Sequence, residues 1–266
     1  MLGVKTTALG FNFTDGADIV ENTLRAEGIA EDFVKVSGKL RTCTKIFDES
    51  AGHMIELNEY GSAVTKADES ALTEKVVRVA KDCRIIVLSG SMPGGISDDF
   101  YFRCIEQIKK ASPDVKTVVD AQGETLLPAL RAAPYLIKPN IHEFTSTFGF
   151  EINSEADLDK YAKEVLKKYS IGIVCVSLGA NGAYITDGER SYIAEAVKVP
   201  VRSLQGVGDS MVAGICLAIL EERSICEMLK YGLASSAASI QLIGTQFGKR
   251  DEFDKILLGD FLVREI

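Results

Sequence analysis

A short motif late in the chain, Gly206-Val207-Gly208-Asp209, places two glycines and an aspartate before the apolar run Met211–Leu220. The run predicts a buried helix, whose first turn presents unpaired N–H groups and the positive end of the helix dipole. Glycines before such a turn let an anion approach these groups, which suits phosphate binding. Asp209 then has two interpretations. It takes a proton from a hydroxyl nucleophile during phosphoryl transfer, or it is an N-cap worth about 1 kcal/mol. The motif alone leaves both open.

A second candidate site lies in "LIKPNIHEF", where Lys138 and Asn140 follow an apolar strand and Glu143 comes three residues later. Ligands bind at the carboxyl ends of parallel strands, and Mg²⁺ prefers oxygen ligands and keeps several waters. Asn140 and Glu143 therefore suit a Mg²⁺ ion or its bound waters. The alternative is a capping box at the start of a helix, and these residues alone favour that alternative.

Two glycine-containing loops could also contact a ligand. In "VSLGANGAYI", Ser177 and the backbone suit a nucleotide phosphate, whereas Asn181-Gly182 predicts a hairpin turn in any case. In "LSGSMPGGI", a buried strand opens into a Gly/Ser/Pro loop that lets backbone and hydroxyl groups reach a ligand. An ordinary strand-to-helix turn explains this second loop equally well.

The elements that must position these residues alternate between apolar strands and helices. The predicted strands include "RIIVLSG", "KTVVDA", "YLIKPN" and "IGIVCVSLG". This alternation predicts an α/β fold with a mostly parallel sheet covered on both faces. The β-rich stretch Phe33–Glu59 departs from it and predicts a small flap, with a hairpin around the turn Glu49–Gly52. We expect an α/β core at residues 1–32 and 61–266 and a lid at 33–60.

Composition and further motifs exclude several classes of function. The chain has 266 residues, 46% of them hydrophobic, with a net charge of −8, which argues against nucleic acid or an anionic membrane surface as a partner. Six cysteines without a C-x-x-C pair predict buried thiols, and two histidines exclude a His-rich metal centre. The apolar run of the predicted helix is too short to span a bilayer, and we expect a cytoplasmic protein. P-loop and Rossmann glycine patterns are absent.

Taken in order and at this spacing, the motifs resemble those of the ribokinase-like (PfkB) family of phosphosugar kinases. The resemblance rests on "LSGSMPGGI", "DAQGETL", "LIKPNIHEF", "VSLGANGA", "GVGDSMVAG" and "GTQF", and it extends over nearly all of the chain. It implies a three-layer α/β/α sandwich with a mostly parallel sheet and a small β lid. It also implies transfer of a phosphoryl group from ATP, with Mg²⁺, to a sugar phosphate. Fructose 1-phosphate, giving fructose 1,6-bisphosphate, is the leading substrate and tagatose 6-phosphate the alternative.

The same resemblance implies roles for individual residues. Asp209 is the expected catalytic base, and the expected anion hole consists of the N–H groups of Gly206, Val207 and Gly208. The expected residues at Mg²⁺-bound waters are Asn140 and Glu143, with Lys138 nearby, and those at the nucleotide are Ser177, Gly179 and Gly182. Arg41 and Ser91 are expected to hold the phosphate of the sugar, with Lys45 as a weaker candidate. A solvated strand face is the alternative for Arg41 and Lys45.

Members of the family carry further segments before the part that "LGVKTTALGF" resembles: a strand, an Asn-Pro-x-x-Asp segment and a Gly-Gly-Lys-Gly loop that grips the sugar. We therefore expect an open apolar sheet edge, a reduced lid and a reduced sugar site in this chain. This gives a second hypothesis, a remnant that binds nucleotide without acting on sugar. The exposed lid sheet also suits a homodimer.

Overall fold

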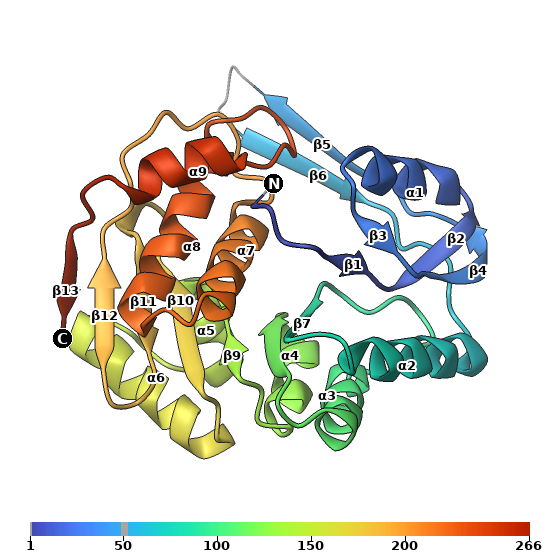
Figure 1. Ribbon diagram of the computed structural model, residues 1–266, viewed down its shortest axis with the longest axis horizontal. Helices are drawn as coiled ribbons and strands as arrows, with labels where there is room; N and C mark the ends of the chain where they lie inside the picture. Colours follow the sequence, from blue (N-terminus) through green and yellow to red (C-terminus); the bar gives the residue numbers. More distant parts are fainter. Residues whose placement is uncertain (1, 49–52) are drawn as a thin grey trace.

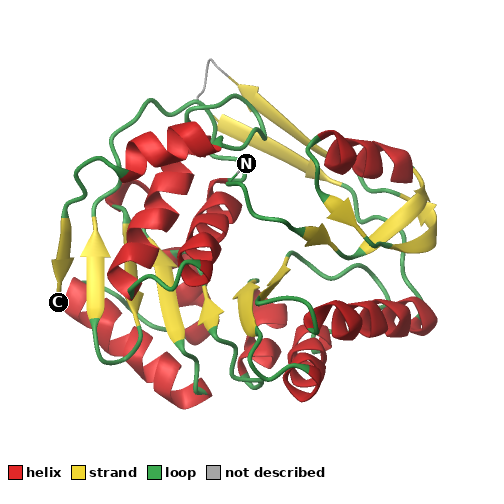
Figure 2. Ribbon diagram, in the orientation of Figure 1, coloured by secondary structure: helices red, strands yellow, loops and turns green. Residues whose placement is uncertain are grey.

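The computed structural model describes residues 2–48 and 53–266, and its centre is a seven-stranded sheet in the order β13-β12-β11-β10-β9-β8-β7 (Figures 1 and 2). The parallel strands are β7 (Ile85–Ser89), β8 (Lys116–Asp120), β9 (Leu136–Ile137) and β10 (Ile173–Ser177). The antiparallel additions are β11 (Ala183–Thr186), β12 (Ser191–Ala194) and β13 (Val263–Glu265). Two antiparallel steps restore the direction, so β12 points the same way as the four parallel strands. The α/β class with a mostly parallel sheet is confirmed.

Two hydrophobic cores lie on the two faces of this sheet. Because successive strand residues point to opposite faces, Val118 and Val119 of β8 belong to different cores. One core includes side chains of α2 (Lys66–Ala80), α3 (Phe100–Ala111), α4 (Gly123–Leu130), α5 (Ile141–Phe148) and α6 (Glu155–Tyr169). The other includes side chains of α7 (Val207–Leu220), α8 (Ile225–Ile240) and α9 (Arg250–Leu257). This is the predicted three-layer α/β/α arrangement.

The N-terminal part of the chain forms a second body beside α2 (Figure 1). Its parallel strand pairs are β1 (Thr7–Ala8) with β3 (Ala30–Glu31) and β2 (Phe11–Asp15) with β4 (Val34–Lys39). The helix between them is α1 (Ala17–Ala26). The predicted hairpin is formed by β5 (Cys43–Asp48) and β6 (His53–Asn58), which pair antiparallel; the predicted turn Glu49–Gly52 lies outside the described residues. The division into a core and a lid at residues 33–60 stays a prediction. The strand pairing does not follow that boundary, because β4 lies inside the predicted lid and pairs with β2, which lies outside it.

The main sheet has an open edge at β7. Over the described residues β7 pairs only with β8, and no strand pair joins the N-terminal strands to the main sheet. The edge is apolar: Val87 is 43% exposed, and Ile85 and Ile86 are partly buried. The expected open apolar edge is therefore present at β7. The parts on either side of it are held together by helices, loops and side chains rather than by a β-ladder.

One local prediction is corrected by the structure. The predicted hairpin is present, since β10 and β11 pair antiparallel, but Asn181-Gly182 is not its two-residue turn: the strands are connected by a longer loop that contains a 3₁₀ turn, Gly179–Asn181. At the end of the chain, β13 returns to the sheet and pairs with β12. A strand's partner depends on distant sequence, which local pattern does not report.

The cysteines and the helices bear on two further expectations. All six cysteines are free thiols, and Cys104 and Cys175 are buried as predicted, but Cys43 is exposed on the hairpin. Among the described residues, no helix has both the length and the apolar character that a membrane crossing requires.

Candidate active site

The start of α7 presents the glycine-aspartate motif to an open space. Gly206 is the N-cap, in the left-handed region at φ 69°, and no side-chain hydrogen bond caps the helix. The first intrahelical bond runs from the N–H of Ser210 to the carbonyl of Gly206, at 2.8 Å. The N–H groups of the preceding turn therefore have no acceptor within the helix. Asp209 is exposed in this turn, three residues after the N-cap, so its interpretation as the N-cap is wrong.

The rest of α7 is an anchor in the core. The Ser210 hydroxyl donates to the carbonyl of Gly206 at 2.8 Å and lies 2.8 Å from the hydroxyl of Ser239 on α8. Gly214 lets the two helices approach closely, because a Cβ there would lie 2.3 Å from the carbonyl oxygen of Tyr231. Each large aliphatic side chain buried along α7 contributes about 1.5–3 kcal/mol, so the orientation of its first turn is firmly held.

A buried lysine and an aspartate lie beneath this first turn, at the carboxyl ends of two neighbouring parallel strands. Lys138 is 5% exposed, and its Nζ lies 3.2 Å from Oδ1 of Asp120. A Cβ on Gly208 would be 3.5 Å from the same Nζ, so the ammonium group adjoins the anion-binding turn. Burial raises the pKa of Asp120 despite the attraction of Lys138, and the nearby charges of Asp209 and Glu143 raise it further. The structure thus brings three carboxylates and one lysine into one electrostatic neighbourhood.

Asp120 was not among the residues singled out from the sequence. It ends the apolar strand of "KTVVDA", and Lys138 follows the next strand along the sheet. The carboxyl ends of adjacent parallel strands meet at one edge, so this shared position is the signal that identifies Asp120.

Asn140 and Glu143 form the capping box of α5. The Glu143 N–H donates to Asn140 Oδ1 at 2.9 Å, and the Asn140 N–H donates to Glu143 Oε2 at 2.8 Å. The capping alternative is therefore present, and it uses one oxygen of each side chain. The box fixes the Glu143 carboxylate near Asp120, since the charge of Glu143 contributes to the raised pKa of Asp120. A structural role and a role at a ligand are compatible here.

The nucleotide candidates divide into accessible and buried positions. Ser177 adjoins Asn140 through a backbone bridge, and its N–H donates to the carbonyl of Pro139 at 3.1 Å. Gly179 is exposed, and a Cβ there would meet no atom within 4 Å. Gly182 is buried, and a Cβ there would lie 1.9 Å from the carbonyl oxygen of Ala194. Gly179 and Ser177 are thus accessible to a ligand, whereas the close approach to Ala194 explains the glycine at 182.

The substrate-phosphate candidates are Arg41 in the segment before β5, Lys45 on β5 and Ser91 in the loop after β7. Arg41 donates from Nη2 to Oγ of Ser91 at 3.3 Å, which joins the two bodies. Lys45 is ion-paired with Glu56, its cross-strand neighbour on the hairpin. The structure therefore brings Arg41 and Ser91 together and holds Lys45 in a separate pair.

One large cavity lies between the two bodies, and four of these groups line it, whereas Lys138, Asn140, Glu143, Ser177 and Gly179 are not part of its lining. Its volume is about 1480 Å³, and its polar lining includes Arg41, Ser91, Asp120 and Asp209. Apolar side chains of β2, β7 and α7 line much of the remainder. The cavity is large enough for a sugar phosphate together with the end of a nucleotide. Among the described residues no cluster of three His, Cys, Asp or Glu side chains forms a ready metal site, so the expected Mg²⁺ would depend on waters and phosphates.

Comparisons with known proteins identify the family to which the chain belongs. Residues 1–252 match the model of the pfkB family carbohydrate kinases. The 1-phosphofructokinase of Vibrio cholerae is 30% identical over 255 residues, which are 96% of this chain and 79% of that protein. The phosphofructokinase-2 of Escherichia coli, in complex with potassium, superposes with a TM-score of 0.88 at 28% identity, covering 96% of this chain and 82% of that one. A tetrameric inhibited form of the same enzyme gives a TM-score of 0.86 at 27% identity, with the same coverage. The chain belongs to the pfkB family of carbohydrate kinases, phosphotransferases that act on an alcohol group.

Proposed function

We propose that this kinase transfers the γ-phosphoryl group of ATP to fructose 1-phosphate and forms fructose 1,6-bisphosphate. The observation that carries the proposal is the position of Asp209 beside unpaired N–H groups, in a cavity that Arg41 and Ser91 also line. A base and an anion hole, together with a guanidinium and a hydroxyl in the same cavity, suit a substrate with a hydroxyl and a phosphate. The similarity to 1-phosphofructokinase supports this choice of sugar.

The residue roles follow from these positions. Asp209 accepts the proton of the attacking hydroxyl, while the N–H groups of Gly206, Val207 and Gly208 stabilise the transferring group. Lys138 adds a positive charge beneath the same turn. Arg41 and Ser91 bind the phosphate already present on the sugar, and Lys45 is the remaining, weaker candidate. Ser177 and Gly179 line the nucleotide, and Gly182 shapes their loop.

Mg²⁺ fits the oxygen donors at the end of the sheet. Glu143 retains Oε1 outside the capping box, the single side-chain oxygen of Asn140 keeps a second lone pair, and Asp120 lies nearby with an unfavourably buried charge. Hard oxygen ligands of this kind, with bound waters, are those that Mg²⁺ prefers. When bound, the ion neutralises charge on the phosphates of ATP.

The experiment measures ADP release from ATP and Mg²⁺ with fructose 1-phosphate, tagatose 6-phosphate and fructose 6-phosphate in turn. Preferential turnover of fructose 1-phosphate is the expected result. Preference for tagatose 6-phosphate would replace the substrate, and that sugar remains the second candidate. Folded protein that binds ATP but phosphorylates none of the three would favour the nucleotide-binding remnant.

We further propose a homodimer that forms through the hairpin. Ile46 and Ile55 are cross-strand neighbours and Leu57 lies on the same face; these three side chains are 47%, 50% and 57% exposed. An apolar face on a two-stranded sheet favours pairing with a second copy. The tetrameric form of the similar phosphofructokinase-2 shows that such a fold assembles. Light scattering of the wild type and of Ile55→Lys tests the proposal, and an unchanged mass for the variant would contradict it.

A further inference from the structure

The relative position of Arg41 and Ser91 depends on α2, because no β-ladder joins the bodies that carry them. Over residues 2–48 and 53–266, β2 pairs only with β4 and β7 pairs only with β8. Leu72 and Val76 on α2 share a core with Val34 of β4, while the start of α2 faces α3. The way in which the start of α2 is fixed therefore sets the geometry of the proposed phosphate site.

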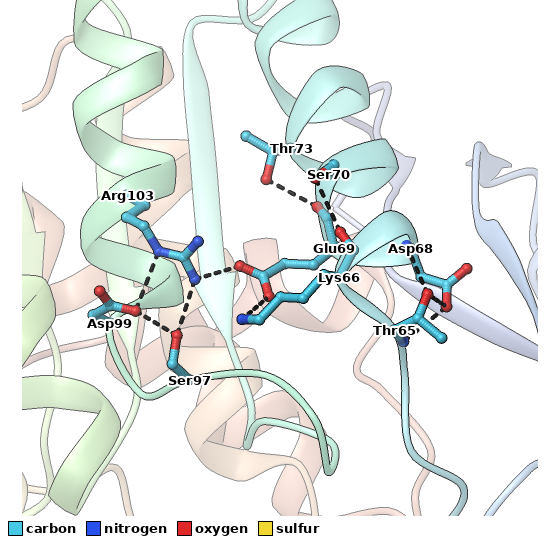
Figure 3. A network of polar contacts seen from close by, with 9 residues as sticks. All are labelled: Thr65, Lys66, Asp68, Glu69, Ser70, Thr73, Ser97, Asp99 and Arg103. Atoms are coloured by element: carbon cyan, nitrogen blue, oxygen red, sulfur yellow. Dashed lines mark hydrogen bonds and ion pairs between the residues drawn. The ribbon is translucent and has the colours of Figure 1, made fainter.

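A buried carboxylate, Glu69, fixes that start (Figure 3). Glu69 is 2% exposed, is ion-paired with Arg103 of α3, and accepts a hydrogen bond of 2.8 Å from Lys66. Burial raises the pKa of Glu69, but the hydrogen bonds from Lys66 and Arg103 outweigh burial and leave that pKa below its usual value. A buried charge held by two cations is costly to disturb, because removal of one partner leaves the other uncompensated.

Arg103 connects Glu69 to the loop that begins at Ser91. Its Nη2 donates to Oγ of Ser97 at 3.1 Å, and its Nε donates to Oδ1 of Asp99 at 3.2 Å. Figure 3 shows the guanidinium between Glu69 on one side and Ser97 and Asp99 on the other. The far end of the Ser91 loop is thereby tied to α2.

A second path runs from α2 back to Arg41. Thr65 caps α2, and the preceding Val64 donates its N–H to the carbonyl of Gly94 at 2.8 Å. Ser62 accepts a hydrogen bond of 2.8 Å from the N–H of Lys39 at the end of β4.

Gly61 brings this path to the arginine itself. A Cβ on Gly61 would lie 3.2 Å from Cβ of Arg41, so the arginine stem rests on this backbone. The bond between Arg41 and Ser91 then closes a ring of contacts in which Glu69 is the buried charge.

We propose that Glu69 is a positioning residue for sugar-phosphate binding, which acts through Arg103 and the Gly61–Thr65 segment to hold Arg41 against Ser91. The inference rests on the proposed function in assigning the phosphate to Arg41 and Ser91. Glu69 itself contacts no substrate. Its effect is on the distance between Arg41 and Ser91, the two side chains that bind the phosphate of the sugar. A displacement of about 1 Å in such a pair is enough to change kinetics by up to a hundredfold.

The experiment compares Glu69→Gln with the wild type by two independent measurements. The first is steady-state kinetics: the KM for fructose 1-phosphate is expected to rise about tenfold or more, with kcat and the KM for ATP changed less than about twofold. The second is amide hydrogen exchange without substrate, in which residues 61–65 and 91–97 are expected to exchange faster. Glu155→Gln is the matched control, because Glu155 forms an ion pair with Arg264 on an exposed surface.

The outcomes separate this inference from the proposed function. Glu69→Gln with a lower melting temperature but unchanged KM and unchanged exchange in both segments would overturn the positioning role. Wild-type protein that phosphorylates none of the sugars would overturn the proposed function. Hydrogen exchange would in that case still test whether Glu69 holds residues 61–65 and 91–97 in place. Arg103→Lys keeps a charge beside Glu69 but loses the fork to Ser97 and Asp99, so it should show an intermediate rise in KM. If Glu69→Gln does not fold, Arg103→Lys carries the test, and a wild-type KM and exchange pattern would refute the proposal.

Discussion

The ammonium group of Lys138 lies 3.2 Å from the carboxylate of Asp120, directly beneath the first turn of α7. This pair joins two strand ends to the helix that carries Asp209. The lysine partly offsets the three carboxylates that face the same space, yet burial keeps the pKa of Asp120 above its usual value. The site is therefore poised to accept a further positive charge or a hydrogen-bonding ligand.

Replacing Asp209 by Asn removes the proposed base without changing the size of the side chain. Because proton transfer by a positioned carboxylate contributes about 10²–10⁴-fold, kcat should fall by that order while ATP affinity stays within about twofold. Asp251→Asn is the matched control, as Asp251 is also an exposed acid in the first turn of a helix. Retained turnover in Asp209→Asn would mean that Asp209 is not the base.

Lys138→Met should lower kcat, because it removes the positive charge beneath the anion-binding turn of α7. Lys138 is the cation that lowers the pKa of Asp120, so its loss leaves burial and the neighbouring carboxylates to raise that pKa further. Lys163→Met, which removes the lysine of another Lys–Asp pair on α6, is the control in the steady-state kinetics. A wild-type kcat for Lys138→Met would show that this charge is not part of the catalytic electrostatics.

Arg41→Ala should raise the KM for the sugar phosphate while the KM for ATP is unchanged. A charge-assisted hydrogen bond to a phosphate contributes about 1.5–3 kcal/mol, which corresponds to a rise of about ten- to a hundredfold. Arg25→Ala is the comparison, because Arg25 is exposed on α1 and its guanidinium bonds Asn22. An equal change in both KM values would place Arg41 outside the sugar-phosphate site.

Asp32→Asn should destabilise the protein at neutral pH and have little effect in acid. The hydrogen bond from Lys75 is the largest influence on Asp32, and with the contribution of Arg78 it lowers the pKa of this carboxyl in the folded state. A lowered folded-state pKa gives stability that is present above the unfolded pKa of about 4 and is lost as the pH falls through the folded value. Because the pair is partly exposed, the loss at pH 7 should be about 1 kcal/mol or less. Urea unfolding at pH 7 and pH 3 measures the difference, and an equal effect at both values would contradict this origin.

Two glycines in one loop should respond differently to alanine. Gly182→Ala places a Cβ 1.9 Å from the carbonyl of Ala194 at φ 97°, whereas Gly179→Ala at φ 60° meets no atom within 4 Å. Gly179→Ala should therefore lower the free energy of unfolding by about 1–2 kcal/mol, the cost of an alanine in the left-handed conformation. Gly182→Ala should lower it clearly more, because the close contact adds to that cost. Thermal unfolding of the two variants measures this, and equal losses would rule out the close contact as the reason for Gly182.

The sequence by itself determined the class of fold and indicated which residues to consider for the site. Apolar strands that alternate with helices predicted the layered sheet, and the glycines before Asp209 predicted an anion-binding helix start. Both follow from local rules, namely strand and helix periodicity and the unpaired N–H groups of a first turn. Residues 136–144 likewise predicted the capping box of α5 that the structure contains.

Only the tertiary structure decided which of these residues meet. Asp120 joined the site because β8 and β9 are neighbours, and Lys45 was taken into a pair with Glu56 by the hairpin register. The dependence of Arg41 and Ser91 on Glu69 was equally invisible, since Glu69 on α2 and Arg103 on α3 are brought together only by the packing of the two helices. Such contacts are set by packing between segments distant in sequence, whereas the local pattern of a chain records only what each segment buries and exposes.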